Sequence, residues 1–121
     1  MKHKVQFISL EDSDKDIIIS FAIDDAELRI KSLILHRTLF FEQLLDDEER
    51  GVKVSLEGDS FDEEDFNMLH EIKIGDQQID ISSSFRSYQL DVSDIEKREI
   101  ENMVTLLKKQ NYDDRFKIHV A

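Results

Sequence analysis

The chain contains no cysteine, no proline and no tryptophan, and only three glycines in 121 residues. The absence of cysteine excludes disulfide frameworks, thiolate zinc sites, iron–sulfur clusters and cysteine nucleophiles. The glycines stand at positions 51, 58 and 75, so they cannot form the glycine-rich loops that cradle phosphate groups. These absences remove the thiol-dependent enzymes and the commonest nucleotide-binding proteins from consideration.

Long hydrophobic runs are also missing. A run such as Ile17–Ile19 has only three residues, whereas a membrane-spanning helix needs about 20 apolar residues. The apolar stretch Val5–Leu10 near the N-terminus is interrupted by Gln6 and Ser9 and is too short for a secretory signal. The sequence therefore predicts a cytoplasmic protein with no membrane partner.

Positive charge is scarce relative to negative charge. Lys and Arg number 16 against 28 Asp and Glu, which gives a net charge of −12. Such a chain is repelled by nucleic-acid phosphates and is steered toward basic partners or cations. We therefore expect no nucleic-acid partner. Acidity that serves only solubility is the alternative explanation of the same numbers.

What the chain does have is enough apolar material for one folded domain over residues 1–121. Hydrophobic residues make up 40 % of it, which is sufficient for a core at this length. Alternating patterns predict short strands, as at Ile17–Ile23, where every second side chain is large and apolar. The complete set of predicted strands is 5–10, 17–23, 27–35, 52–56, 68–74, 77–82, 87–92 and 116–120.

Two segments have helical spacing instead. Around residues 39–47, Phe40 and Leu44 are separated by four positions, which favours a short helix that begins after Thr38. Near the C-terminus, Ser93 and Glu96 have the spacing of a capping box. A longer apolar face follows that box and includes Ile100, Met103, Val104 and Leu107, and the predicted helix ends at Asn111.

Together these elements predict an α+β fold. We expect a mostly antiparallel, twisted sheet of about six to eight short strands with the C-terminal helix packed on it. The segment 116–120 is expected to be an edge strand, and an edge strand can pair with a second copy of the chain. The sequence thus leaves a homodimer open.

The sharpest electrostatic feature is the segment Glu57–Asp65, which holds six acids and no base in nine residues. An aromatic side chain within a negative field suits a contact with a basic protein surface, because aromatics supply burial and carboxylates supply steering. The alternative is a mobile loop with Phe61 packed against the core. The candidate interaction residues are Glu57, Asp59, Phe61, Asp62, Glu63, Glu64 and Asp65.

Metal and catalytic motifs are weak. Asp12, Asp14 and Asp16 alternate as in a calcium loop, but the Gly and Glu that an EF-hand needs at its sixth and twelfth positions are Ile17 and Ile23 here. A solvated turn is the alternative interpretation. The four histidines at positions 3, 36, 70 and 119 lack ligand spacing. We expect no cofactor, no assigned metal site and no catalytic residue.

Three functional hypotheses follow. The leading one is a small acidic module that docks a basic protein surface, of which an inhibitor or immunity-type partner of a nucleic-acid-acting enzyme is one version. The second is an accessory domain without a ligand. The third is a weak divalent-cation-binding protein or an enzyme that uses Asp, Glu and His. The sequence contains no motif that identifies a function, and it favours a protein that is not an enzyme.

Overall fold

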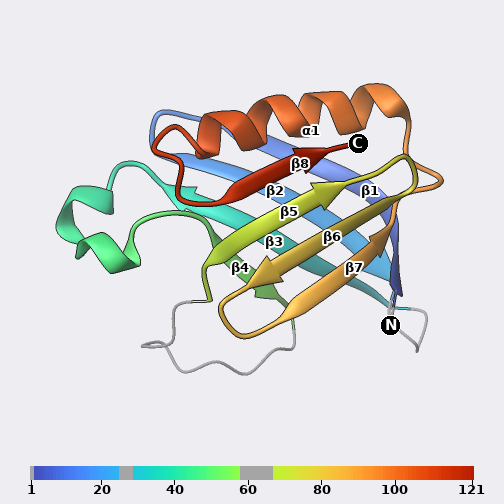
Figure 1. Cartoon of the computed structure of the whole chain (residues 1–121), viewed down its shortest axis with the longest axis horizontal. Helices are drawn as coiled ribbons and strands as arrows, with labels where there is room; N and C mark the ends of the chain where they lie inside the picture. Colours follow the sequence, from blue (N-terminus) through green and yellow to red (C-terminus); the bar gives the residue numbers. More distant parts are fainter. Residues whose placement is uncertain (1, 25–28, 58–66) are drawn as a thin grey trace.

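The computed structural model describes residues 2–24, 29–57 and 67–121, which form a mixed α+β fold (Figure 1). Each predicted strand overlaps a strand of the structure, so the predicted fold class is confirmed. The strands are β1 (Lys2–Asp12), β2 (Asp16–Asp24), β3 (Ile30–Thr38), β4 (Lys53–Leu56), β5 (Leu69–Ile74), β6 (Gln78–Ser83), β7 (Ser87–Asp91) and β8 (Lys117–Val120). The remaining elements are the helix α1 (Lys97–Gln110) and two 3-10 turns, η1 (Glu42–Leu44) and η2 (Asp47–Glu49).

The strands form one sheet in the order β4-β3-β2-β1-β7-β6-β5-β8. Neighbouring strands are antiparallel except for β1 with β7 and β5 with β8, which are parallel. The sheet folds over on itself, so β1–β4 form a layer behind β5–β8 in Figure 1. The long strand β1 joins the layers because its first residues pair with β7 and its later residues pair with β2.

The terminal strand β4 also contacts the segment that leads into β5. Lys53 in β4 forms an antiparallel bridge with Met68, just before β5. The Val54 amide donates to the Asn67 carbonyl, and the Leu69 amide donates to the Val52 carbonyl, each at 2.8 Å. These bonds leave β4 without the fully open edge that a terminal strand would otherwise present.

The core fills the space between the layers. Along β2, Ile17, Ile19, Phe21 and Ile23 are all buried, as their alternation predicts. The helix α1 lies along the upper side of both layers (Figure 1) and adds Met103, Leu106 and Leu107 to the same core. Within the described ranges, no helix is both long and apolar enough to cross a membrane.

The predicted capping box of the last helix is wrong, although the helix and its end are confirmed. The helix begins at Lys97, with Glu96 at the N-cap position and no side-chain cap bond. The preceding residues form a turn, in which the Ile95 amide donates to the Val92 carbonyl and the Ser93 amide donates to the Asp91 side chain. This turn places Ile95 against the core. The helix therefore begins about one helical turn later in the sequence than the capping box predicts.

The predicted short helix at 39–47 is replaced by η1 and η2. An α-helix there would bury Phe40 and Leu44 on one face, but both side chains are exposed. The buried side chain of this segment is Glu42, which bonds Arg37. The ion pair between Glu42 and Arg37 therefore determines which side of this segment is buried, and Phe40 and Leu44 remain exposed.

Candidate protein-interaction site

Residues 39–50, here called the 39–50 loop, project to one side of the two layers between β3 and β4 (Figure 1). The loop exposes three large apolar side chains. Phe40 is 53 % exposed, Phe41 55 % and Leu44 77 %. The two rings meet edge to face with their centroids 4.9 Å apart. The two rings form a contiguous exposed apolar surface, and such surfaces are characteristic of interaction sites.

Carboxylates follow these apolar side chains directly. The second half of the loop contains Asp46, Asp47, Glu48 and Glu49 and a single base, Arg50. The first three acids are exposed and Glu49 is half-buried. The loop therefore places an aromatic surface beside a negative field, which is the combination that the sequence predicts for the segment Glu57–Asp65.

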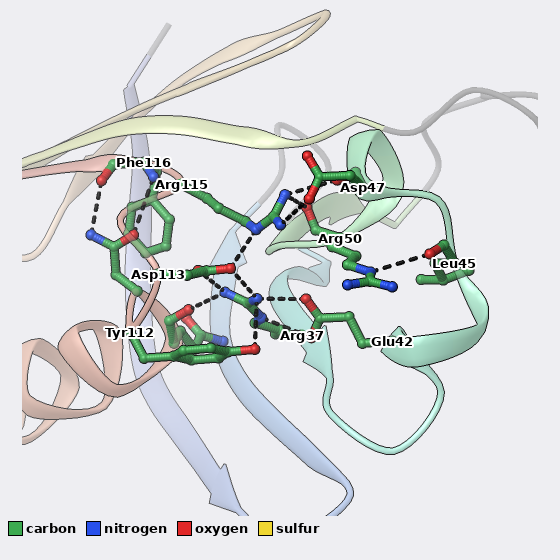
Figure 2. A network of polar contacts seen from close by, with 11 residues as sticks. Arg37, Glu42, Leu45, Asp47, Arg50, Tyr112, Asp113, Arg115 and Phe116 are labelled. Atoms are coloured by element: carbon green, nitrogen blue, oxygen red, sulfur yellow. Dashed lines mark hydrogen bonds and ion pairs between the residues drawn. The ribbon is translucent and has the colours of Figure 1, made fainter.

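The loop is held in place by a buried arginine at the end of β3 (Figure 2). The Arg37 guanidinium is fully buried and donates to both carboxylate oxygens of Glu42 in η1. It also donates to both carboxylate oxygens of Asp113, at 2.8 and 2.9 Å. Two-point bonding of this kind fixes geometry as well as charge. Arg37 thus connects the loop to the segment that follows α1.

The remaining contacts of Arg37 come from the last residue of α1 and from the segment that follows it. Its Nη1 donates to the Gln110 carbonyl at 2.7 Å, and its Nη2 donates to the Tyr112 hydroxyl at 3.0 Å. The guanidinium carbon lies 4.3 Å from the centre of the Tyr112 ring, a cation–π distance. Every side of this buried cation is therefore in contact with an acceptor or an aromatic ring.

The pKa values of this network follow from these contacts. Burial acts to lower the pKa of Arg37, but hydrogen bonds with Asp113 and Glu42 outweigh it, so the pKa lies above its ordinary value. The Arg37 hydrogen bond holds the pKa of the Asp113 carboxyl well below its usual range, against the effect of burial and with help from Arg115. Arg37 and Asp113 therefore remain ionised throughout the physiological pH range.

A second arginine fastens the far end of the loop. Arg115 donates from Nη1 to the Asp47 and Arg50 carbonyls, at 2.8 and 3.2 Å, and from Nη2 to the Asp47 carboxylate at 2.7 Å. Its Nε bonds Asp113, the carboxylate that also bonds Arg37. The Arg115 hydrogen bond lowers the pKa of Asp47. Asp113 therefore links the middle and the end of the loop.

The beginning of the loop is attached to the β1–β2 turn. The amides of Leu39 and Phe40 both donate to the Lys15 carbonyl, at 2.7 and 3.2 Å. The Lys15 ammonium lies 5.6 Å from the centre of the Phe40 ring. The loop thus has three attachments and no regular secondary structure beyond its two short turns. Its exposed side chains stand on a backbone that is already ordered.

A cleft of about 550 Å³ opens beside η2. Its lining includes the carboxylates of η2, the two bases Arg50 and Arg115, and the side chains of Met68, His70 and Ser84. The Ser84 hydroxyl lies 3.3 Å from His70 Nε2 and accepts the Met68 amide. Gly51, with a φ of 124°, also lines the cleft. A Cβ at this position would lie 3.3 Å from both Met68 and Arg115.

The predicted interaction segment lies largely outside the described residues. Of its seven named residues, the structure describes Glu57, which directly follows β4 and whose amide donates to the Ser32 carbonyl. The others are Asp59, Phe61, Asp62, Glu63, Glu64 and Asp65. The 39–50 loop is an additional candidate surface that the sequence did not identify as one.

The three aspartates of the weak calcium candidate do not share a partner. Asp12 bonds the Lys109 ammonium at 2.6 Å, and Asp16 bonds His36 at 2.7 Å, while Asp14 is exposed. In the part of the chain that the structure describes, no three His, Asp or Glu side chains are grouped to hold a metal ion.

The histidines lie on separate strands. His36 in β3 bonds Asp16, and His119 in β8 bonds Glu71 at 3.1 Å. His70 in β5 and His119 in β8 are on neighbouring strands, but the partner of His119 in the register is Lys73. The sheet therefore does not place His70 opposite His119.

Comparison with protein-family models finds no match, and comparisons with curated proteins and with solved structures also find none. The signal for the network was present in the sequence, because Arg37 continues the inward-facing positions of Leu33 and Leu35 in β3. A cation at an inward position of a strand requires buried acids around it.

Proposed function

We propose that this protein is a small binding module that docks a basic protein surface through the 39–50 loop. The observation that carries the proposal is the exposure of Phe40, Phe41 and Leu44 on a loop fastened by the buried Arg37 network. Aromatic anchors dominate the energy of protein interfaces. An ordered loop binds with a smaller loss of conformational entropy than a mobile one.

Charge supports the choice of partner. A chain of net charge −12 attracts basic surfaces over a long range. The carboxylates of η2 stand beside the aromatic anchors, so steering and burial act at the same place. An inhibitor of an enzyme that acts on nucleic acids is a concrete version, because such enzymes have basic clefts that a carboxylate array occupies.

The cleft beside η2 suits a basic side chain of the partner. Asp47 is already paired with Arg115, so Glu48 and Glu49 would pair with an ammonium or guanidinium group of the partner. The apolar lining residues Val52, Met68 and Leu69 would contact the aliphatic stem. An interface built from the loop and the cleft would therefore combine aromatic anchors supplied by this chain with a lysine or arginine supplied by the partner.

The test is affinity capture from a native lysate with washes at low and moderate salt. The wild-type chain is compared with a triple variant, Phe40→Ser/Phe41→Ser/Leu44→Ser. Phe85→Ser is the matched control, because Phe85 has the same 53 % exposure as Phe40 but lies in the β6–β7 turn. We expect one basic protein to be retained near stoichiometry by the wild type and the control and lost by the triple variant.

Two results would contradict the proposal. One is a diffuse set of basic proteins that washes off near 0.15 M salt, where charge–charge attraction between exposed groups is largely screened beyond about 8 Å. The other is a specific partner that the triple variant retains. In the second case, charge reversal within Glu57–Asp65 would test whether the predicted segment carries the contact instead.

A further inference from the structure

The two layers of the sheet have very different outer faces. On the layer of β5–β8, every row of outward side chains carries charge, as with Glu71 and Lys117 in one row and Asp80, Lys73 and His119 in the next. This is the usual solvated face of an antiparallel sheet. The strand register gives the corresponding rows on the layer of β1–β4.

Seven adjacent residues in two central rows of that second face carry no charge. We call them the uncharged rows. They are unusual in a chain of which 36 % is charged. The first row crosses β1, β2 and β3, and beyond Ser32 it is followed by the charged Glu57, whose amide donates to the Ser32 carbonyl. The second row crosses all four strands. The first contains Phe7, Ala22 and Ser32, and the second contains Ser9, Ser20, Ile34 and Ser55.

A β-bulge brings an aromatic side chain onto this face. In a regular strand Phe7 would point to the same side as the buried Val5, but the register of β1 shifts between these two residues. The shift places Phe7 opposite Ala22 on the outer side, where its ring is 53 % exposed. Bulges that re-aim a side chain are typically functional features rather than defects.

We propose that the uncharged rows are the interface of a homodimer in which the two β1–β4 layers pack face to face. Two chains of net charge −12 repel each other. Contact through rows with few charges lowers the electrostatic cost of association. Small serines and an alanine allow the close approach of aligned sheets, which pack about 10 Å apart.

The next row along the strands supports a second copy as the occupant. It contains Glu11, Ile18, His36 and Lys53, in the order β1 to β4. A two-fold axis parallel to the strands, between β2 and β3, reverses this order in the partner copy. Glu11 of each chain then faces Lys53 of the other. The same axis places Ser20 opposite Ile34 and brings no like charges together in these three rows.

The size of the face suits a weak dimer. Strands β2 and β3 are nine residues long, β4 is four residues long, and β1 pairs with β2 from Val5 to Asp12. At about 4.8 Å between strands and about 3.3 Å per residue, this layer covers roughly 480 Å² in projection, which is below the roughly 800 Å² that each partner buries in a standard interface.

The experiment is the mass of the chain in solution, measured by light scattering and by sedimentation at about 0.2 mM, where a dimer with a Kd near 10 μM is well populated. We expect about twice the 14.3 kDa of one chain. Ser20→Glu should give the monomer, because it places two buried carboxylates in the contact. Ser82→Glu is the matched control on the outer face of β6, and it should remain a dimer.

A charge exchange tests the axis independently of the serine variants. Glu11→Lys and Lys53→Glu should each raise the dimer Kd at least tenfold by creating like-charged pairs, and the double variant should recover wild-type association. A monomeric wild type would overturn the proposal, as would a dimer that Ser20→Glu leaves intact. Double-variant association no better than that of the singles would overturn the assigned axis. None of these substitutions lies in the 39–50 loop, so failure here is distinguishable from failure of the proposed function.

Discussion

Arg37 shows how one buried residue can hold a surface in place. An unpaired guanidinium in a protein core would cost several kcal/mol of desolvation. Here the cost is offset because Glu42, Asp113, Tyr112 and a main-chain carbonyl surround the cation. The two acids come from segments that are 71 residues apart in sequence. The 39–50 loop and the C-terminal segment are therefore stabilised together by a single side chain.

Asp113 provides a test of that network through pH. Asp113→Asn removes one of the two carboxylates that Arg37 and Arg115 bind, and we expect it to lower the unfolding free energy by about 2 kcal/mol near pH 6. The native pKa of Asp113 is depressed, first by the Arg37 hydrogen bond. Its contribution is therefore complete above the unfolded-state pKa of about 3.9 and is lost as the pH falls through the native pKa.

The measurement is urea unfolding of both proteins between pH 2 and pH 6. The difference between them should be constant down to about pH 4 and should shrink below it. Asp114→Asn is the control, because Asp114 is an exposed neighbour with a φ of 54° that asparagine tolerates. A difference for Asp113→Asn that is unchanged at the lowest pH would contradict the assigned ion pairs.

Among the secondary-structure elements, α1 lacks a side-chain hydrogen bond at its N-cap, although a single substitution would give it a capping box. Glu96 occupies the N-cap position, where its long side chain forms no cap bond, and Glu99 stands at the third helical residue. Glu96→Ser would complete a capping box with Glu99. We expect the unfolding free energy to rise by about 1 kcal/mol, measured by urea denaturation.

Glu96→Gln is the control, because it removes the same negative charge without supplying a good N-cap. It should stabilise the protein less than Glu96→Ser. Equal effects of the two variants would mean that charge relief, and not capping, accounts for the gain. Ser93→Ala should change the unfolding free energy by no more than about 0.5 kcal/mol, because Ser93 lies outside the helix.

The elements themselves could be predicted because their signals are local. The alternation at Ile17, Ile19, Phe21 and Ile23 identifies β2 and its buried face. The sheet order could not be predicted, since the parallel pairs β1–β7 and β5–β8 join segments far apart in the chain. The layer that carries the uncharged rows is visible only once this order is known.

The candidate site was missed for a related reason. The spacing of Phe40 and Leu44 imitates an amphipathic helix, and a local pattern contains no information about Arg37 as a buried partner for Glu42. The bulge between Val5 and Phe7 likewise cannot be read from β1 alone, because it depends on the partner strand β2. In both cases a tertiary contact decides which apolar side chains are exposed.

For the whole molecule, the excess of acid sets the response to ions. A net charge of −12 in a compact chain produces self-repulsion, which added salt screens. We expect the melting temperature to rise by about 3–6 °C, equivalent to about 1 kcal/mol for a chain of this size, as NaCl increases from about 0.02 to 0.3 M.

The melting temperature in calcium chloride at equal ionic strength shows whether any of the stabilisation comes from a specific cation site. We expect no gain beyond that of NaCl, because Asp12 and Asp16 already pair with Lys109 and His36. An additional rise with CaCl₂ that Asp14→Asn abolishes would establish the calcium hypothesis at the β1–β2 turn. It would also mean that Ca²⁺ displaces Lys109 from Asp12, because a site of several oxygen ligands needs that carboxylate. The Lys109→Met variant would then bind calcium more tightly than the wild type.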